Sequence, residues 1–312
     1  MNTEGFAHEL VAAALHALMS DARAARERVL LTSASPPAGS AESGADEEAL
    51  HDFRVALRRM RTILRVAREL FRRKRLARIE GEIRYHAQAT GALRDEEVLR
   101  ETLGALDLSP EARAELDAWL ARRARAVKNE HAAVTRLLRD GPRERVLAFP
   151  GGKRVRRLER SFEALAARLD GDAPRLVPTS DLGHVVLDRA ARDVAKWALR
   201  DVADADAMHE LRIRYKRLRY TADLFAAPLG ATATRLAKQA ARMQKHLGEL
   251  HDIDQARLTL SRARGLGPAT KGAVVAALHA SRVACASKVE PHLVKARTLA
   301  DRVPDDEPPV AV

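Results

Sequence analysis

Two segments of this chain carry histidine and basic residues at matching positions. HDFRVALRRMR begins at His51, and HELRIRYKRLR begins at His209. Residues three or four apart share one face of a helix, so each segment presents a row of cations. We call them the first stripe (His51, Arg54, Arg58, Arg61 and Arg65) and the second stripe (His209, Arg212, Lys216 and Arg219). Such a row can bind phosphate oxygens, for which the planar arginine fork is well matched.

Like charges at these spacings repel each other, so each stripe favours an anionic ligand. The competing interpretation is a solvated face in an arginine-rich protein, since 45 of the 55 Lys and Arg residues are Arg. The repetition of a single-sign stripe in two segments favours the ligand. Arg59 and Arg217 leave the stripes and are predicted to be surface or ion-pair residues.

Further basic residues could extend such a site. The additional candidates for the site are Arg94, Lys196, Lys238, Arg242, Lys245 and His251. Lys238, Arg242 and Lys245 step by four and three toward Gly248, whereas Lys196 ends a basic ridge with Arg189 and Arg192. A ligand site and a solvated face are equally good interpretations of these ridges.

The elements that must position the stripes are amphipathic helices. An apolar seam accompanies each stripe: Phe53, Leu57, Met60, Leu64, Ala67 and Phe71 in the first segment, and Leu211, Tyr215, Leu218, Ala222 and Phe225 in the second. The composition is rich in Ala, Leu, Arg and Glu, and strand patterns are nearly absent. The predicted fold class is therefore all-α, with antiparallel helices at about 6–31, 47–73, 75–107, 110–139, 153–170, 181–202, 205–227, 232–264 and 269–300.

The chain also repeats itself. The two stripes are 158 residues apart, and GALRDEE at 91–97 matches GELHDID at 248–254. Two matches in the same order predict an internal duplication. The expected division is a first four-helix half at 5–140, a basic connector and linking helix at 141–178, a second four-helix half at 179–302 and a tail at 303–312.

The repeated motif H-x-x-R-x-x-x-[RK]-R-x-R, with LG-x-L-x-D downstream, resembles the CHAD domain (conserved histidine α-helical domain) over 5–302. The resemblance implies two four-helix bundles related by a pseudo-two-fold axis, with a basic channel between them that binds inorganic polyphosphate. It also implies that this channel is lined by His51, Arg54, Arg58 and Arg61 of the first stripe and by His209, Arg212, Lys216 and Arg219 of the second. The first copy departs from the pattern, with Arg94 where the second copy has His251.

Composition limits the alternatives. A net charge of +12 favours a polyanionic partner, and only 11 aromatic residues leave few platforms for stacking bases. A helical nucleic-acid-binding protein stays the main alternative to a polyphosphate binder. The pairs His51-Asp52 and His251-Asp252 are also found in HD-type metal phosphohydrolases. This alternative is weaker, because the positive charge of the neighbouring arginines would repel a metal cation. Asp252 and Asp254 are expected to pair with arginines or to cap a helix.

No catalytic residue, metal site or cofactor is predicted. The segment Gly151-Gly152-Lys153-Arg154 lacks the spacing of a P-loop, and Cys285 stands alone. With no apolar run near 18 residues, we expect no membrane span. The segment MNTEGFAHELV has no basic stretch followed by an apolar one, so we expect no secretory signal and a cytoplasmic protein. The CHAD resemblance implies an association with polyphosphate granules. Oligomeric state is left open.

Overall fold

The structure is a computed structural model that describes residues 5–32, 43–141 and 157–300. The predicted fold class is correct: the described residues form helices and no strand, apart from one isolated bridge between Phe6 and Pro178. The helices are α1 (Ala7–Thr32), α2 (Ser43–Ala67), α3 (Arg73–Ala89), α4 (Gly91–Gly104), α5 (Pro110–Asp140), α6 (Leu158–Gly171), α7 (Thr179–Ala198), α8 (Ala205–Leu224), α9 (Ala226–Leu229), α10 (Ala231–Ser261) and α11 (Pro268–Ala300).

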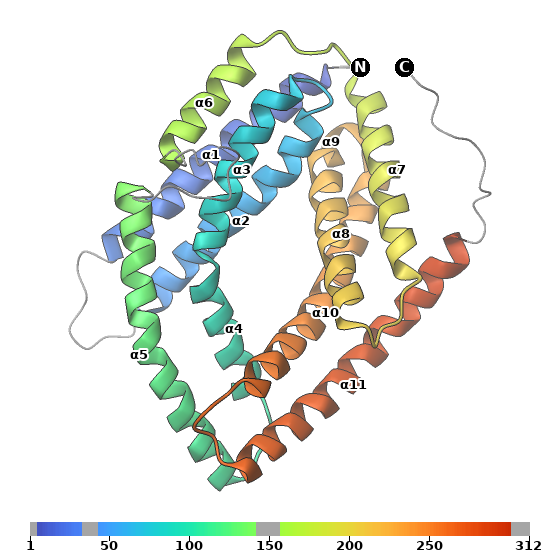
Figure 1. The fold of residues 1–312 in the computed structure, drawn as a ribbon. Helices are drawn as coiled ribbons and strands as arrows, with labels where there is room; N and C mark the ends of the chain where they lie inside the picture. Colours follow the sequence, from blue (N-terminus) through green and yellow to red (C-terminus); the bar gives the residue numbers. More distant parts are fainter. Residues whose placement is uncertain (1–4, 33–42, 142–156, 301–312) are drawn as a thin grey trace.

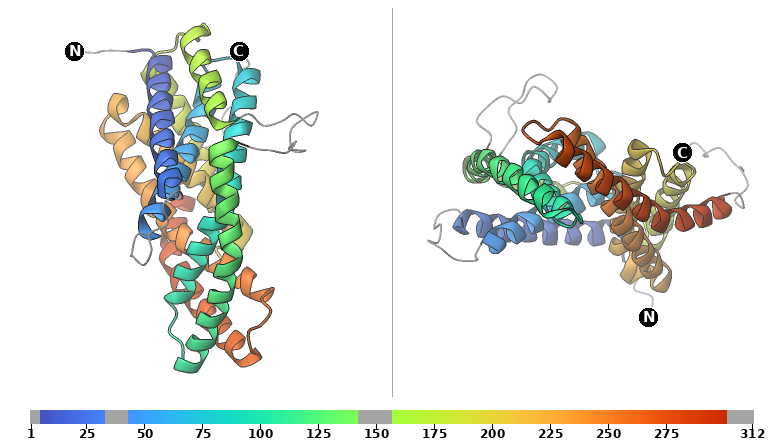
Figure 2. Two further views of the ribbon diagram at one scale, coloured as in Figure 1. Left: turned by 90° about the vertical axis from the view of Figure 1, so that its left-hand side faces the viewer. Right: turned by 90° about the horizontal axis from the view of Figure 1, so that it is seen from below.

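The helices fall into two groups that meet along the length of an elongated molecule (Figures 1 and 2). One group is built around α1, α2 and α3, and the linking helix α6 packs on α1 and α3. The other is built around α7, α8 and α10, and α4, α5, α10 and α11 converge at the far end (Figure 1). Contacts between the groups join α1 to α7, α2 to α8, α4 to α10 and α5 to α11. Each pair joins helices at corresponding places in the two predicted halves; the duplication itself stays a prediction.

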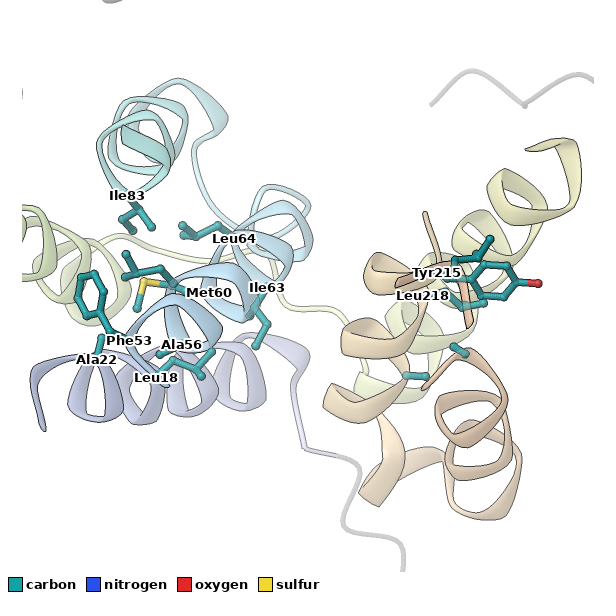
Figure 3. Close-up of a cluster of buried hydrophobic side chains, with 14 of the residues drawn as sticks. Leu18, Ala22, Phe53, Ala56, Met60, Ile63, Leu64, Ile83, Tyr215 and Leu218 are labelled. Atoms are coloured by element: carbon teal, nitrogen blue, oxygen red, sulfur yellow. The ribbon is translucent and has the colours of Figure 1, made fainter. Parts of the chain in front are cut away.

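The apolar seams are buried as predicted. All six residues of the first seam, from Phe53 to Phe71, are buried, and so are all five of the second, from Leu211 to Phe225. Figure 3 shows Phe53 and Met60 of α2 among side chains of α1 and α3, while Tyr215 and Leu218 lie in the other group. Each seam anchors its helix in its own group, which leaves another face of each helix for the stripe.

The predicted continuous helix 75–107 is wrong, because the chain breaks at Thr90. Thr90 has φ −94° and ψ 6° and separates α3 from α4. Its side-chain hydroxyl donates to the carbonyls of His86 and Ala87, at 3.2 and 3.1 Å, in place of the next helical N–H groups. The half at 5–140 therefore contains five helices, and the corresponding α10 runs unbroken past Gly248.

The close approach of α7 to the second seam depends on a glycine. A Cβ on Gly183 would lie 2.8 Å from Cδ1 of the buried Phe225 ring. We expect Gly183→Val to lower the free energy of unfolding by about 1–3 kcal/mol. Gly272 of α11 has open space around its Cα, so the control Gly272→Val should change stability by less than about 0.5 kcal/mol. Denaturant unfolding measures both, and equal stabilities would contradict this packing.

Candidate functional site

The two stripes face each other where α2 meets α8. Arg58 on α2 lies close enough to lower the pKa values of both Arg212 and Lys216 on α8, and Arg54 lowers that of Lys216 as well. The middle of each stripe therefore belongs to one group of charges. We call Arg54, Arg58, Arg212 and Lys216 the cation cluster.

The cation cluster has few partners of its own. The Nε atoms of Arg54 and Arg212 are buried without a hydrogen bond, and so is that of the neighbouring Arg61. The side chains of Arg58 and Lys216 make no hydrogen bond or ion pair with any described residue. The repulsion predicted from the sequence is therefore present in the fold and is left largely uncompensated.

Burial raises the electrostatic free energy of these charges further. Burial, followed by Arg212 and Arg58, lowers the pKa of Lys216 from 10.5 to about 6. Burial and the adjacent Arg58 also lower the pKa of Arg54. Desolvation disfavours a charged form, and a like charge nearby disfavours it again. Lys216 is consequently neutral in most molecules at pH 7 unless an anion approaches it.

The arginines Arg54 and Arg212 occupy matching places. The side chain of Arg54 donates from Nη1 to the carbonyl of Ala87 at 3.0 Å and to the hydroxyl of Thr90 at 3.2 Å, and so helps to hold the break between α3 and α4. A Cβ on Gly91 would lie 3.6 Å from its guanidinium, and one on Gly248 would lie 3.7 Å from that of Arg212. Each guanidinium therefore lies against the glycine that begins the downstream motif.

Two aspartates of the downstream motifs are the acidic members of the site. Asp95 of α4 raises the pKa values of Arg54 and Arg212, and Asp252 of α10 raises those of Arg212 and Lys216. Burial raises the pKa of Asp252 itself, against the effect of Arg212 and Lys216. Asp95 was not among the residues predicted from the sequence, although it is the final residue that GALRD shares with GELHD. The sequence also predicted that Asp254 pairs with an arginine. This prediction is confirmed, because Oδ1 of Asp254 is 2.7 Å from Nε of Arg282.

Histidines border the cluster on the second-stripe side. His209 and His251 share a hydrogen bond between their Nδ1 atoms, 3.1 Å apart. Such a bond needs one donor and one acceptor, so the pair cannot be doubly charged while it lasts. Burial, Arg212 and His209 lower the pKa of His251 to about 3, and burial lowers that of His209. The pKa of His51, on the first stripe, is also lowered. Partial loss of hydration is the larger cause, and the positive charge of Arg94 is the next.

The remaining candidates lie around the cluster or away from it. Arg94 pairs with Glu97 at 3.0 Å, Arg219 pairs with Asp223 at 3.7 Å, and Arg65 pairs with Glu80 at 3.8 Å. The side chains of Lys238, Arg242 and Lys245, on α10, are exposed. Lys196 lines a separate cavity between α2, α7 and α8. Arg217, predicted at the surface or in an ion pair, is 3.9 Å from Asp193 but also faces Arg65.

Comparison with known proteins places this arrangement in a family. The model of the CHAD domain matches residues 13–261, which include both stripes and both downstream motifs. The chain belongs to the CHAD-domain family. Uncharacterized proteins from two strains of Mycobacterium tuberculosis are 30% identical to it over 216 residues, which are 66% of this chain and 38% of theirs. The chain thus spans about four tenths of the length of these curated relatives.

Solved structures share the fold. The CHAD domain from the plant Ricinus communis has a TM-score of 0.63 and 22% identity, with 97% of this chain and 94% of that one covered. PptA from Streptomyces chartreusis has a TM-score of 0.62 and 17% identity, with 96% and 100% covered. The described part of this CHAD protein contains no helix long and apolar enough to cross a membrane. Nor do its described residues bring three or more His, Cys, Asp or Glu together as a set for a metal ion.

The cluster residues differ in what they do for stability. The folded-state pKa of Lys216 lies below its ordinary value, so folding becomes less favourable as pH falls from about 10 to about 6 and changes no further below that. We expect Lys216→Met to be more stable than wild type by about 1–4 kcal/mol at pH 7, with the gain shrinking toward pH 10. Arg54→Met should instead lose about 1.5–3 kcal/mol, because it removes the hydrogen bonds at the α3–α4 break.

Denaturant unfolding at several pH values measures both variants. A Lys216→Met protein less stable than wild type at pH 7 would contradict the description of Lys216 as an uncompensated cation.

Proposed function

We propose that this CHAD protein binds inorganic polyphosphate, without converting it chemically, through the cation cluster and the stripes that converge on it. The observation that carries the proposal is the meeting of Arg58 with Arg212 and Lys216, three half-buried cations from two helices without an ion pair to any described residue. A phosphate chain supplies one negative charge per unit at close spacing. The CHAD resemblance implies the same ligand.

The shape of the ligand follows from burial. Cluster residues are half-buried between helices of the two groups, with Asp95 of α4 and Asp252 of α10 beside them. A linear chain of phosphates is thin enough to reach such side chains, whereas a nucleic-acid duplex is far wider than a helix and contacts protruding side chains. Binding along the stripes favours a polymer, because the second stripe binds a chain already held by the first.

Nucleic acid is the competing ligand, since it also selects arginine and a positive field. We also propose that the phosphate chain lies in a channel between the two helix groups and that the protein associates with polyphosphate granules. A protein held by the polymer would accumulate wherever the polymer does.

A paired neutralisation tests the site. The double variant Arg58→Met/Lys216→Met removes a guanidinium and an amine that makes no hydrogen bond or ion pair with a described residue and that a bound phosphate would protonate. We expect its affinity for long-chain polyphosphate to fall by at least about tenfold. Its affinity should also depend less steeply on salt, because fewer counterions are released. Calorimetry or a gel shift at physiological salt, with circular dichroism to verify folding, gives the comparison.

The matched control is Lys74→Met/Arg160→Met, which replaces one lysine and one arginine, the same two residue types, at exposed positions of α3 and α6. It should bind polyphosphate within about twofold of wild type. Equal losses in the two double variants would mean that net charge alone attracts the polymer. Duplex DNA or RNA that binds wild type as tightly as polyphosphate, at matched phosphate concentration, would favour the nucleic-acid function.

A further inference from the structure

A second concentration of positive charge lies apart from the cation cluster. Helices α2, α7 and α8 line a cavity of about 470 Å³ that is open to the surface, a size in the range of small-molecule sites. Six cationic side chains line it: Arg65, Arg189, Arg192, Lys196, Arg214 and Arg217. The carboxylates in its wall are Glu69 and Asp193. The lining therefore has a formal excess of four positive charges.

The two carboxylates are already engaged. Glu69 accepts a hydrogen bond from Arg189 at 2.9 Å. Asp193 is 3.5 Å from Nε of Arg214 and 3.9 Å from Nη1 of Arg217. The side chains of Arg192 and Lys196 have no ion pair or hydrogen bond with any residue that the structure describes. Free cationic groups therefore remain at the α7 wall.

The cavity is on a different face of α8 from the second stripe. At about 100° per residue, Arg214 and Thr221 lie about 160° and 140° around the helix from Lys216. Arg217 is the nearest, at about 100°. A ligand in this cavity would thus meet a set of α8 side chains that the cation cluster does not use. Arg65 is the one stripe residue in its wall, and it lowers the pKa of Arg217 after burial does.

Part of the lining is apolar. Val66 of α2 and Val186 and Ala190 of α7 contribute to the wall, together with the hydroxyl-bearing Thr62 and Thr221. An inorganic phosphate chain has no group that such a surface would favour. Guanidinium groups beside aliphatic side chains and hydroxyls match a molecule that joins phosphates to an apolar ring system with polar edges.

We propose that this cavity is a second ligand site that binds a nucleoside di- or triphosphate, with the phosphates on the α7 and α8 cations and the base against Val66, Val186 and Ala190. This inference is independent of polyphosphate binding. Either site can be lost while the other remains.

The test uses ATP, ADP and inorganic tripolyphosphate as probes, titrated into the full chain by calorimetry without divalent cations. In the Arg58→Met/Lys216→Met background, which lacks the proposed polyphosphate site, we expect ATP to bind saturably and at least about fivefold more tightly than tripolyphosphate, which has the charge but not the base. Arg192→Glu/Lys196→Glu changes two exposed residues of α7 and should weaken ATP binding by at least about tenfold. Lys74→Glu/Arg160→Glu makes the same charge change at exposed positions of α3 and α6 and should bind ATP within about twofold of wild type.

Several results would overturn the proposal. Wild type that does not bind ATP saturably below about 1 mM has no nucleotide site of useful affinity. If tripolyphosphate binds the Arg58→Met/Lys216→Met variant as tightly as ATP does, the apolar wall takes no part in recognition. Equal ATP affinities in the two charge-reversed variants would place binding elsewhere. Arg58→Met/Lys216→Met should keep ATP binding, so a failure of the polyphosphate site is told apart from a failure of this one.

Discussion

Repulsion among half-buried cations is the constraint on which this structure depends. Arg58 of α2 faces Arg212 and Lys216 of α8, and the fold holds them together against their mutual repulsion and their loss of hydration. What opposes this repulsion is hydrophobic burial elsewhere: the seams that include Met60 and Leu211 are fully buried in their own helix groups. Stability is thereby concentrated in the two groups, and the place where they meet keeps its unneutralised charge.

Supporting contacts hold the charged side chains in place without removing their charge. Arg54 donates to neutral acceptors at Thr90 and Ala87, which orient its guanidinium. Asp95 and Asp252 act on the cluster from α4 and α10, but neither makes an ion pair within 4.0 Å of a described cation. The acidic groups nearest the cluster therefore moderate its field, and a positive excess is left for a ligand.

Much of this could be predicted from the sequence, because it follows from helical periodicity. The all-α fold, the buried seams and the basic faces of α2 and α8 all depend on spacings of three and four residues. Periodicity does not show where a helix breaks when neither Gly nor Pro is needed, and the break at Thr90 depends on hydrogen bonds from its own hydroxyl and from Arg54, 36 residues away along the chain. The cavity could not be predicted from the sequence for a similar reason, since α2, α7 and α8 each contribute only part of its wall. The ion pair that Arg217 makes with Asp193 fits its predicted role, but the nearness of Arg65, which belongs to the other helix group, could not be predicted from the helix that carries Arg217.

In the proposed function, a polyanion supplies the negative charge that the protein itself does not place at the cation cluster. An anion beside Lys216 favours its charged form, so binding should draw a proton from solution. The direct measurement is calorimetry of long-chain polyphosphate binding at pH 7.5 in two buffers of different ionisation enthalpy, which reports the protons taken up. We expect uptake on the order of one proton per occupied cluster in wild type, and a clear reduction in Lys216→Arg, whose side chain is charged before binding. Tight binding with no proton uptake, or uptake that is unchanged in Lys216→Arg, would contradict it.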